Sequence, residues 1–310
     1  MSPSRSLPGR APAFRGGTAR RLREGAVVAL LFLCAALSVA TTVAITWALA
    51  SETVAFFREV SLLEFATGTR WAPLFSEQAF GVLPLLSATV LIAACSLAIA
   101  VPAGLAAAVF LSEYAGEWTR AVLKPLLEVL AGIPTVVYGF FALSVIAPAL
   151  QRLFPETQLF SAAAAGTAMG VMIIPFIASI SEDALRAVPR SLREAAYAMG
   201  ATRFDVTARV VVPAALSGVL AACILGASRA VGETMIVTLA AGGQPNLSWN
   251  PLEAMQTMTA YIAAVSLGDT PFGTIEYRTI FAVGSALFLL TFGMNVLGQW
   301  LVARFQEAYE

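Results

Sequence analysis

The sequence predicts an all-α membrane protein with about six transmembrane helices. Hydrophobic residues make up 58% of its 310 residues and charged residues only 12%, against roughly 25% charged in an ordinary soluble domain. Too few polar residues remain to cover the surface of a soluble protein of this size, so lipid must solvate much of the chain. Long runs without a charged residue are the second observation, because about 20 apolar residues cross a bilayer as a helix.

Five of the predicted spans are free of charge and one contains two charged residues. The second span is 35 residues long and contains Pro102 and Gly104, so it is predicted to be one kinked or extended helix. The fifth span, residues 210–240, is apolar except for Arg229 and Glu233. The charge-free spans are residues 25–51, 78–112, 129–151, 157–181 and 279–303.

The distribution of basic residues predicts the topology. With the N-terminus inside, the inner segments hold 14 Lys and Arg residues and the outer segments hold four, which is the bias expected of cytoplasmic loops. Both termini are therefore predicted to be cytoplasmic. Residues 1–24 hold six arginines among Pro, Gly and Ser residues. They are predicted to form a disordered basic cytoplasmic tail, with the transmembrane domain in residues 25–310.

The composition argues against an enzyme active site, a metal site and a bound cofactor. The chain has no histidine, which removes the commonest general base and the commonest metal ligand. Cys34, Cys95 and Cys223 are isolated within apolar runs, so neither a disulfide framework nor a thiolate metal site is predicted. The single lysine, Lys124, precedes Pro125. A Walker A loop is therefore absent, and any ATP must be bound by a separate polypeptide.

The segment between the fourth and fifth spans predicts two short helices joined by a turn. Ser191 and Glu194 have the spacing of a capping box, in which each side chain bonds to the other residue's amide. Gly200 is predicted to end this helix with a positive φ, and a second helix is predicted to start at Thr202. Helices this short are not stable alone, so the first is expected to dock on another protein.

Two other interpretations of this segment are weaker. A helix-turn-helix DNA reader is disfavoured because membrane spans flank the segment closely and its helices carry few base-reading side chains. No nucleic-acid partner is therefore predicted. A simple connector is the remaining alternative, since capping boxes and glycine turns are common.

Arg229 and Glu233 are the charged residues that the sequence places within the membrane. Their spacing of four puts them on one face of a continuous helix, and the cost of charge in hydrocarbon predicts that this face points into the bundle. In one interpretation they neutralise each other and fix the helix to a neighbour. In the favoured one they line a pathway, where the guanidinium binds an oxyanion and the carboxylate keeps binding weak. Glu128 and Pro134 are interpreted as an interfacial charge and a helix kink, with gating as the alternative.

Several motifs resemble known transport proteins. Glu194-Ala195-Ala196, Gly200 four residues later, and Val212-Pro213 resemble the EAA loop of binding-protein-dependent ABC permeases. The loop corresponds to about residues 182–212. The resemblance implies that it forms a coupling helix on the ATPase, with the following residues at the coupling site: Ser191, Glu194, Ala195, Ala196 and Gly200.

Three further stretches, residues 126–142, 229–235 and 250–269, resemble phosphate permeases of the PstC type. The resemblance implies a MetI-like six-helix fold in the bacterial inner membrane and import of inorganic phosphate. It also implies a PstA-like second permease, a PstB-like ATPase dimer that binds the ATP, and a PstS-like phosphate-binding protein. Arg229 and Glu233 match charged positions that this family needs for transport. The alternatives are a permease for molybdate, tungstate or sulfate, and a membrane signalling scaffold that transports nothing.

Overall fold

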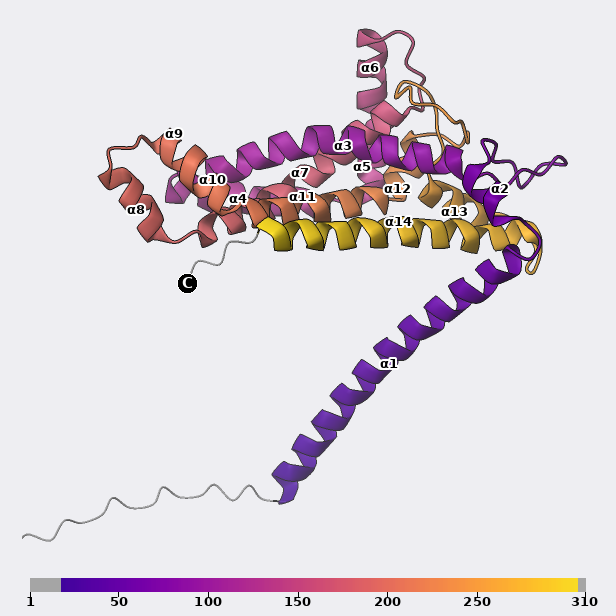
Figure 1. The fold of residues 1–310 in the computed structure, drawn as a ribbon, viewed down its shortest axis with the longest axis horizontal. Coiled ribbons are helices and arrows are strands. Elements are labelled where there is room, and N and C mark those ends of the chain that lie inside the picture. The colour runs from indigo at the N-terminus through magenta and orange to yellow at the C-terminus, as the bar shows by residue number, and fades with distance from the viewer. Residues whose placement is uncertain (1–17, 306–310) are drawn as a thin grey trace, which may run out of the picture. The chain divides into compact units, whose positions relative to one another are not determined.

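The computed structural model describes residues 18–305, and apart from one isolated bridge between Trp71 and Phe80 every regular element within them is a helix (Figure 1). The described chain forms two units, one up to Ala50 and one from Ser51 onward. Helix α1 comprises Thr18–Phe56. The later helices and π-helical turns are α2 (Leu62–Thr67), α3 (Leu83–Val109), η1 (Phe110–Tyr114), α4 (Glu117–Ala131), α5 (Thr135–Phe141), η2 (Ala142–Ile146), α6 (Ala147–Leu153), α7 (Ala162–Ala187), α8 (Arg190–Ala198), α9 (Arg203–Val206), η3 (Thr207–Val211), α10 (Val212–Ala214), α11 (Leu216–Val231), α12 (Met235–Ala240), α13 (Met258–Ser266) and α14 (Ile275–Phe305).

The first unit is the described part of α1 up to Ala50. Its apolar side chains, including Leu31 and Phe32, are exposed along the helix, as expected of a helix whose solvent is lipid. The predicted disordered tail is partly wrong, because residues 18–24 are helical. Continuing a helix from the apolar run costs less than nucleating one, and Arg, Leu and Glu are good helix formers. Residues 1–17 of the predicted tail lie outside the described residues.

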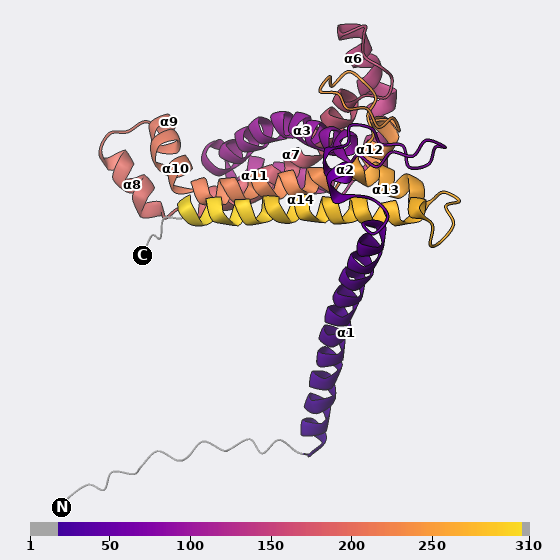
Figure 2. The ribbon, with the colours of Figure 1, turned by 45° about the vertical axis from the view of Figure 1, so that its right-hand side comes forward.

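The second unit contains helices that are long and apolar enough to cross a membrane. Together with α1 there are five such helices in the described chain, or six if the bent pair 203–214 and 216–231 counts as one span. The prediction of about six spans is confirmed. Helices α8 and α9 lie at one end of this unit and α2 and α13 at the other, in both views (Figures 1 and 2). We call these the α8 end and the α13 end.

Helices α3 and α7 form the centre of the second unit and approach each other closely. A Cβ atom added at Gly166 would lie 2.7 Å from Cys95 Cβ, and one at Gly170 would lie 2.9 Å from the carbonyl oxygen of Ser96. Small residues allow such close backbone approach in membranes. Met169 and Ile173, which are fully buried, belong to the hydrophobic core beside this contact.

Gly170→Ala should therefore destabilise the protein. The added methyl meets backbone rather than a flexible side chain, so α3 and α7 must separate, at a cost of about 1–3 kcal/mol. The thermal unfolding midpoint of the detergent-solubilised protein measures the effect. Gly293→Ala is the matched control, since nothing lies within 4 Å of its added Cβ. An equal change in both variants would contradict the tight helix contact.

Two predicted spans, 129–151 and 157–181, start or break at other residues in the structure. The run 129–151 is interrupted: residues 129–131 end α4, and α5 starts only at Thr135, because Pro134 lacks an N–H group and restricts the residue before it. The run 157–181 becomes α7, which starts after Ser161, whose side chain accepts a hydrogen bond from the amide of Ala164. Outside the predicted spans, Met258–Ser266 form α13, which is largely buried against other helices.

The fifth predicted span, residues 210–240, is not one helix. It is bent by 68° between α10 and α11, close to Pro213. It is interrupted again at Gly232, which ends α11, before α12 begins at Met235. Helix α11 packs beside α14, as both ribbon views show (Figures 1 and 2). The second interruption decides the geometry of Arg229 and Glu233.

Candidate translocation and coupling sites

Glu233 lies in the interruption between α11 and α12 and caps the second of these helices. Its Oε1 atom accepts hydrogen bonds from the amides of Met235, at 3.1 Å, and Ile236, at 3.3 Å. These amides belong to the first turn of α12, where no helical carbonyl can receive them. A carboxylate at this position also complements the helix dipole. Glu233 is thereby held in a fixed orientation at the interruption, with its side chain half-exposed.

Arg229 lies in the last turn of α11 and is exposed. Its guanidinium carbon lies 5.6 Å from the centre of the Phe176 ring, within the range of a cation–π contact. Among the described residues, no ion pair within 4.0 Å joins Arg229 to Glu233. The prediction of two charges on one continuous helical face is therefore wrong, because α11 ends between them. No described carboxylate lies within ion-pair distance of the Arg229 guanidinium.

Buried threonines at the start of α13 form hydrogen bonds that fix the main chain between α11 and α12. The hydroxyl of Thr259 donates to the carbonyl oxygen of Glu233 at 2.8 Å. Thr257, the N-cap of α13, accepts from the amide of Ala260, and the amide of Met258 donates to the hydroxyl of Thr89 on α3. The main chain at Glu233 is thus tied to α13 and, through it, to α3. Sequence reasoning missed Thr259, because no local pattern links it to a residue 26 positions earlier.

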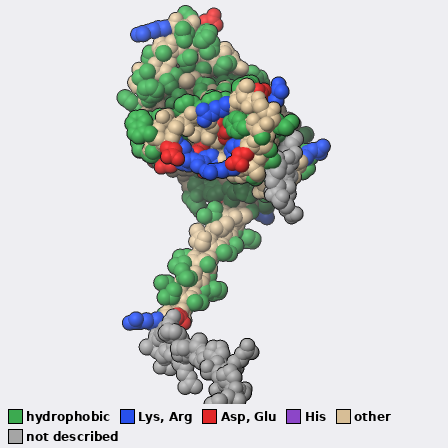
Figure 3. All heavy atoms as spheres, turned by 90° about the vertical axis from the view of Figure 1, so that its left-hand side faces the viewer, with side chains coloured by type: hydrophobic (Ala, Val, Ile, Leu, Met, Phe, Trp, Pro, Cys, Tyr) green, Lys and Arg blue, Asp and Glu red, His purple; other side chains and the backbone are tan. Residues whose placement is uncertain are grey.

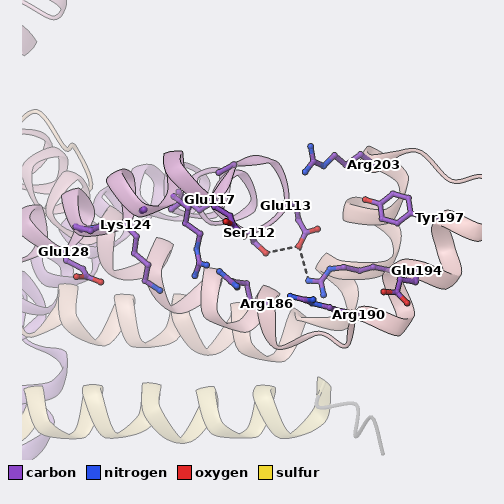
Figure 4. A pocket seen from close by; sticks show the side chains of 16 residues that line it. Ser112, Glu113, Glu117, Lys124, Glu128, Arg186, Arg190, Glu194, Tyr197 and Arg203 are labelled. Atoms are coloured by element: carbon purple, nitrogen blue, oxygen red, sulfur yellow. Dashed lines mark hydrogen bonds and ion pairs between the residues drawn. The ribbon is translucent and has the colours of Figure 1, made fainter.

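The α8 end contains a cavity of about 900 Å³ between η1, α4, the end of α7 and α8. Figure 3 shows basic and acidic side chains gathered around a hollow on this face, and Figure 4 shows them pointing into it. Glu128, for which gating was the alternative interpretation, is exposed and lines the cavity; Pro134 precedes α5 and does not line it. The charged lining residues are Arg120, Lys124, Arg186, Arg190, Arg193 and Arg203, with Glu113, Glu117, Glu128 and Glu194.

Glu182 is a buried carboxylate in the wall next to this cavity. Its side chain is 1% exposed, and its oxygens lie 2.8 Å from Arg120 Nη2 and 2.9 Å from Lys124 Nζ. Arg186, one turn further along α7, lies 3.6 Å away. The hydrogen bond to Glu182 raises the pKa of Lys124 above its ordinary value. Glu182 therefore fastens α4 to the end of α7.

Sequence reasoning missed Glu182 as a structural centre. The sequence does show that Arg120 and Lys124 are four residues apart, and that Glu182 and Arg186 are also four residues apart. This spacing places the members of each pair on one face of a helix. Nothing local shows that the two faces meet across more than 50 residues of chain.

The segment predicted to couple to an ATPase contains two short helices joined at a glycine, as expected. Gly200 has a φ of +84°, which confirms the predicted turn. The capping box predicted at Ser191 and Glu194 is wrong: α8 starts at Arg190 after Pro189, so Ser191 lies within the first turn and caps nothing. The helix therefore starts two residues earlier than predicted, with Pro189 at the N-cap in place of Ser191.

The capping box is at the second helix instead. Thr202 accepts from the amide of Asp205 at 3.3 Å, and the Asp205 carboxylate accepts from the amide of Thr202 at 3.4 Å. Both orphan amides at this helix start are therefore satisfied.

Helix α8 presents an open surface at the end of the unit. Ser191, Glu194 and Ala195 are exposed, whereas Ala196 is half-buried and packs against the hydrophobic cluster under the segment. Large apolar side chains are also exposed here, with Met199 at 88% and Phe204 at 70%. A surface of this kind is typical of a contact site for another protein.

The chain matches known proteins over most of its length. Residues 100–307 match the family model of the binding-protein-dependent transport system inner membrane component. A Bacillus subtilis protein named probable ABC transporter permease protein YqgH is 36% identical over 287 residues, which cover 92% of this chain and 93% of the relative. The phosphate transport system permease protein PstC of Xylella fastidiosa is 32% identical over 262 residues, covering 78% and 79%.

Solved transporters share the fold. The inward-facing MetNI methionine ABC transporter matches with a TM-score of 0.54 and 19% identity over 73% of this chain and 95% of the other. A bacterial ABC transporter that imports alginate matches with a TM-score of 0.56 and 16% identity over 85% and 96%. The predicted MetI-like fold is confirmed. The chain is a permease subunit, and a separate ATPase hydrolyses the ATP. It belongs to the family of binding-protein-dependent transport system inner membrane components.

Proposed function

We propose that this chain is the permease subunit of an ATP-driven importer that carries inorganic phosphate across the bacterial inner membrane. Several relatives at 30–32% identity are named phosphate transport system permease proteins. The observation that carries the proposal is Arg229, an exposed guanidinium at an interruption of the fifth span with no ion-pair partner among the described residues. A planar fork of N–H donors suits a tetrahedral oxyanion.

Glu233 gives this site a second chemical feature. Its Oε1 atom caps α12, and this keeps a carboxylate near a guanidinium without neutralising it. Near neutral pH, phosphate carries at least one P–OH group, which can donate a hydrogen bond to a carboxylate. Sulfate and molybdate carry no such proton and cannot donate one. The carboxylate also prevents the arginine from holding the anion too tightly for release. These properties favour phosphate over the other oxyanions.

The proposed orientation places the α8 end in the cytoplasm and the α13 end outside. The basic residues support it, since the segments on the α8 side hold most of the Lys and Arg residues and such residues accumulate on cytoplasmic loops. Both termini are then cytoplasmic. Arg229 lies thirteen residues past Leu216, the first residue of α11, roughly 20 Å along that helix, which places it within the bilayer.

The partners follow from the surfaces at the two ends. In this proposal α8, with Ser191, Glu194 and Ala195 exposed, contacts a PstB-like ATPase dimer that binds the ATP, so this chain needs no cofactor. A PstS-like binding protein delivers phosphate to the α13 end. A PstA-like permease completes the pathway, and the exposed apolar side chains of α5, Val136 and Phe140, offer it or the surrounding lipid a contact. Glu128 on the cavity wall is proposed to contribute to gating.

Uptake of radiolabelled phosphate by proteoliposomes tests the function. We expect ATP-dependent uptake when this chain, the second permease and the ATPase are reconstituted with the binding protein. A large excess of unlabelled phosphate should abolish uptake of the label, whereas sulfate, molybdate and tungstate should leave most of it. Strong competition by one of these anions would indicate that oxyanion as the substrate. An assembled complex with ATPase activity but no flux of any oxyanion would instead support the signalling scaffold.

A further inference from the structure

A buried ion pair connects α8 to the inner end of α3. Glu113 lies in the π-helical turn η1, which directly continues α3, and its side chain is only 7% exposed. Its Oε1 atom accepts from Arg193 Nη2 at 3.1 Å and from the hydroxyl of Ser112 at 2.8 Å. Dashed lines in Figure 4 mark these contacts of Glu113.

The same guanidinium also holds the end of α7. Arg193 Nη2 donates to the carbonyl oxygen of Leu185 at 2.8 Å, and Nη1 donates to that of Val188 at 2.5 Å. Leu185 lies in the last turn of α7, and Val188 is its C-cap. The Leu185 carbonyl otherwise receives only the amide of Val188, at 3.4 Å, so the guanidinium adds donors where the helix itself supplies few. One side chain on α8 therefore bonds to two transmembrane helices at once.

The chemistry of this contact requires arginine. Three N–H···O bonds leave the guanidinium in different directions within one plane, and lysine, a point charge on a flexible stem, cannot reproduce that geometry. The pair is also buried: the Arg193 side chain is 17% exposed. Buried pairs of this kind contribute more to orientation than to net stability, so a mechanical role fits them better than a purely stabilising one.

We propose that Arg193 is a positioning residue that transmits displacement of α8 to α3 and α7 together, through Glu113 and the two carbonyls at the end of α7. This inference rests on the proposed docking of the ATPase on α8. The other contacts at this end are less suited to the task. Arg209 and Asp205 lie 3.7 Å apart, but Arg209 is 82% exposed, and exposed pairs transmit little energy.

The first test measures phosphate uptake per ATP hydrolysed in the reconstituted complex. Arg193→Lys and Glu113→Gln should assemble with the ATPase and hydrolyse ATP at close to the wild-type rate, but should transport at least about fivefold less phosphate per ATP, the lower range of a coupling energy between two sites. Arg209→Lys is the matched control and should match wild type. Equal ratios in all variants would overturn the proposal. So would uptake and hydrolysis that fall in the same proportion.

A second measurement does not depend on uptake. Spin labels at Ala198→Cys and Tyr114→Cys, both exposed sites, report the distance between α8 and the inner end of α3 once Cys34, Cys95 and Cys223 are replaced by alanine. In the wild-type background this distance should stay constant when ATP is added. With Arg193→Lys it should change. A distance that changes equally in both backgrounds would refute the coupling. Failure of the wild-type complex to transport phosphate would instead refute the proposed function.

Discussion

Arg229→Gln should reduce phosphate uptake by about a hundredfold or more, with the amount of assembled complex unchanged. Each charge-assisted hydrogen bond to the passing anion contributes about 1.5–3 kcal/mol, and an arginine fork offers two of them. Folding should not suffer, because Arg229 forms no ion pair with another described residue and is exposed. Radiolabelled phosphate uptake, normalised to complex abundance on a membrane immunoblot, measures the effect.

The matched control for this experiment is Arg304→Gln. Arg304 is also an exposed arginine in the last turn of a helix with an aromatic ring nearby, at 5.6 Å from the centre of Trp300. It lies far along the chain from the proposed pathway, so uptake should remain close to wild type. Arg229→Lys keeps the charge without the fork and should give an intermediate rate. Normal uptake by Arg229→Gln would remove this residue from the pathway.

Glu182→Gln should have the largest effect on stability. It leaves the volume of the side chain unchanged but removes the charge that three cationic side chains surround. Breaking a buried pair costs about 3–5 kcal/mol, and we expect the lower end of this range. The reason is that Arg120 and Lys124 keep 30% and 28% exposure of their side chains, so water recovers part of the loss.

Thermal unfolding of the purified protein in detergent measures this loss as a lower midpoint. Asp183→Asn is the internal control on the next residue. Asp183 also contacts Lys124, at 3.1 Å, but its side chain is 66% exposed, and exposed pairs contribute about 0–1 kcal/mol. Equal shifts of the unfolding midpoint in the two variants would show that the buried carboxylate contributes no more to stability than the exposed one.

The features that the sequence predicted correctly are those that one segment determines by itself. Long charge-free runs locate the spans, because hydrocarbon tolerates little else. Gly200 was predicted to take a positive φ, because other residues take that conformation only with strain. Arg229 was identified because an isolated arginine in an apolar run is costly.

The features that the sequence did not predict depend on competition or on distance along the chain. At Ser191 a capping motif was present, but the helix start at Pro189 took precedence. Gly232 ends a helix in one setting and continues it in another, so the interruption before Glu233 could not be foreseen. The contacts of Glu182 and Thr259 join residues from different helices, which no local pattern encodes.

The bend of 68° between the helix pair 203–214 and 216–231 has a mechanical consequence. When two helices are joined at such an angle, a movement of the first along its own axis displaces the second mainly perpendicular to the axis of the second. Pressure from the ATPase would thus tilt the fifth helix and slide it little along its axis. Arg229 would sweep laterally at a nearly constant depth in the bilayer.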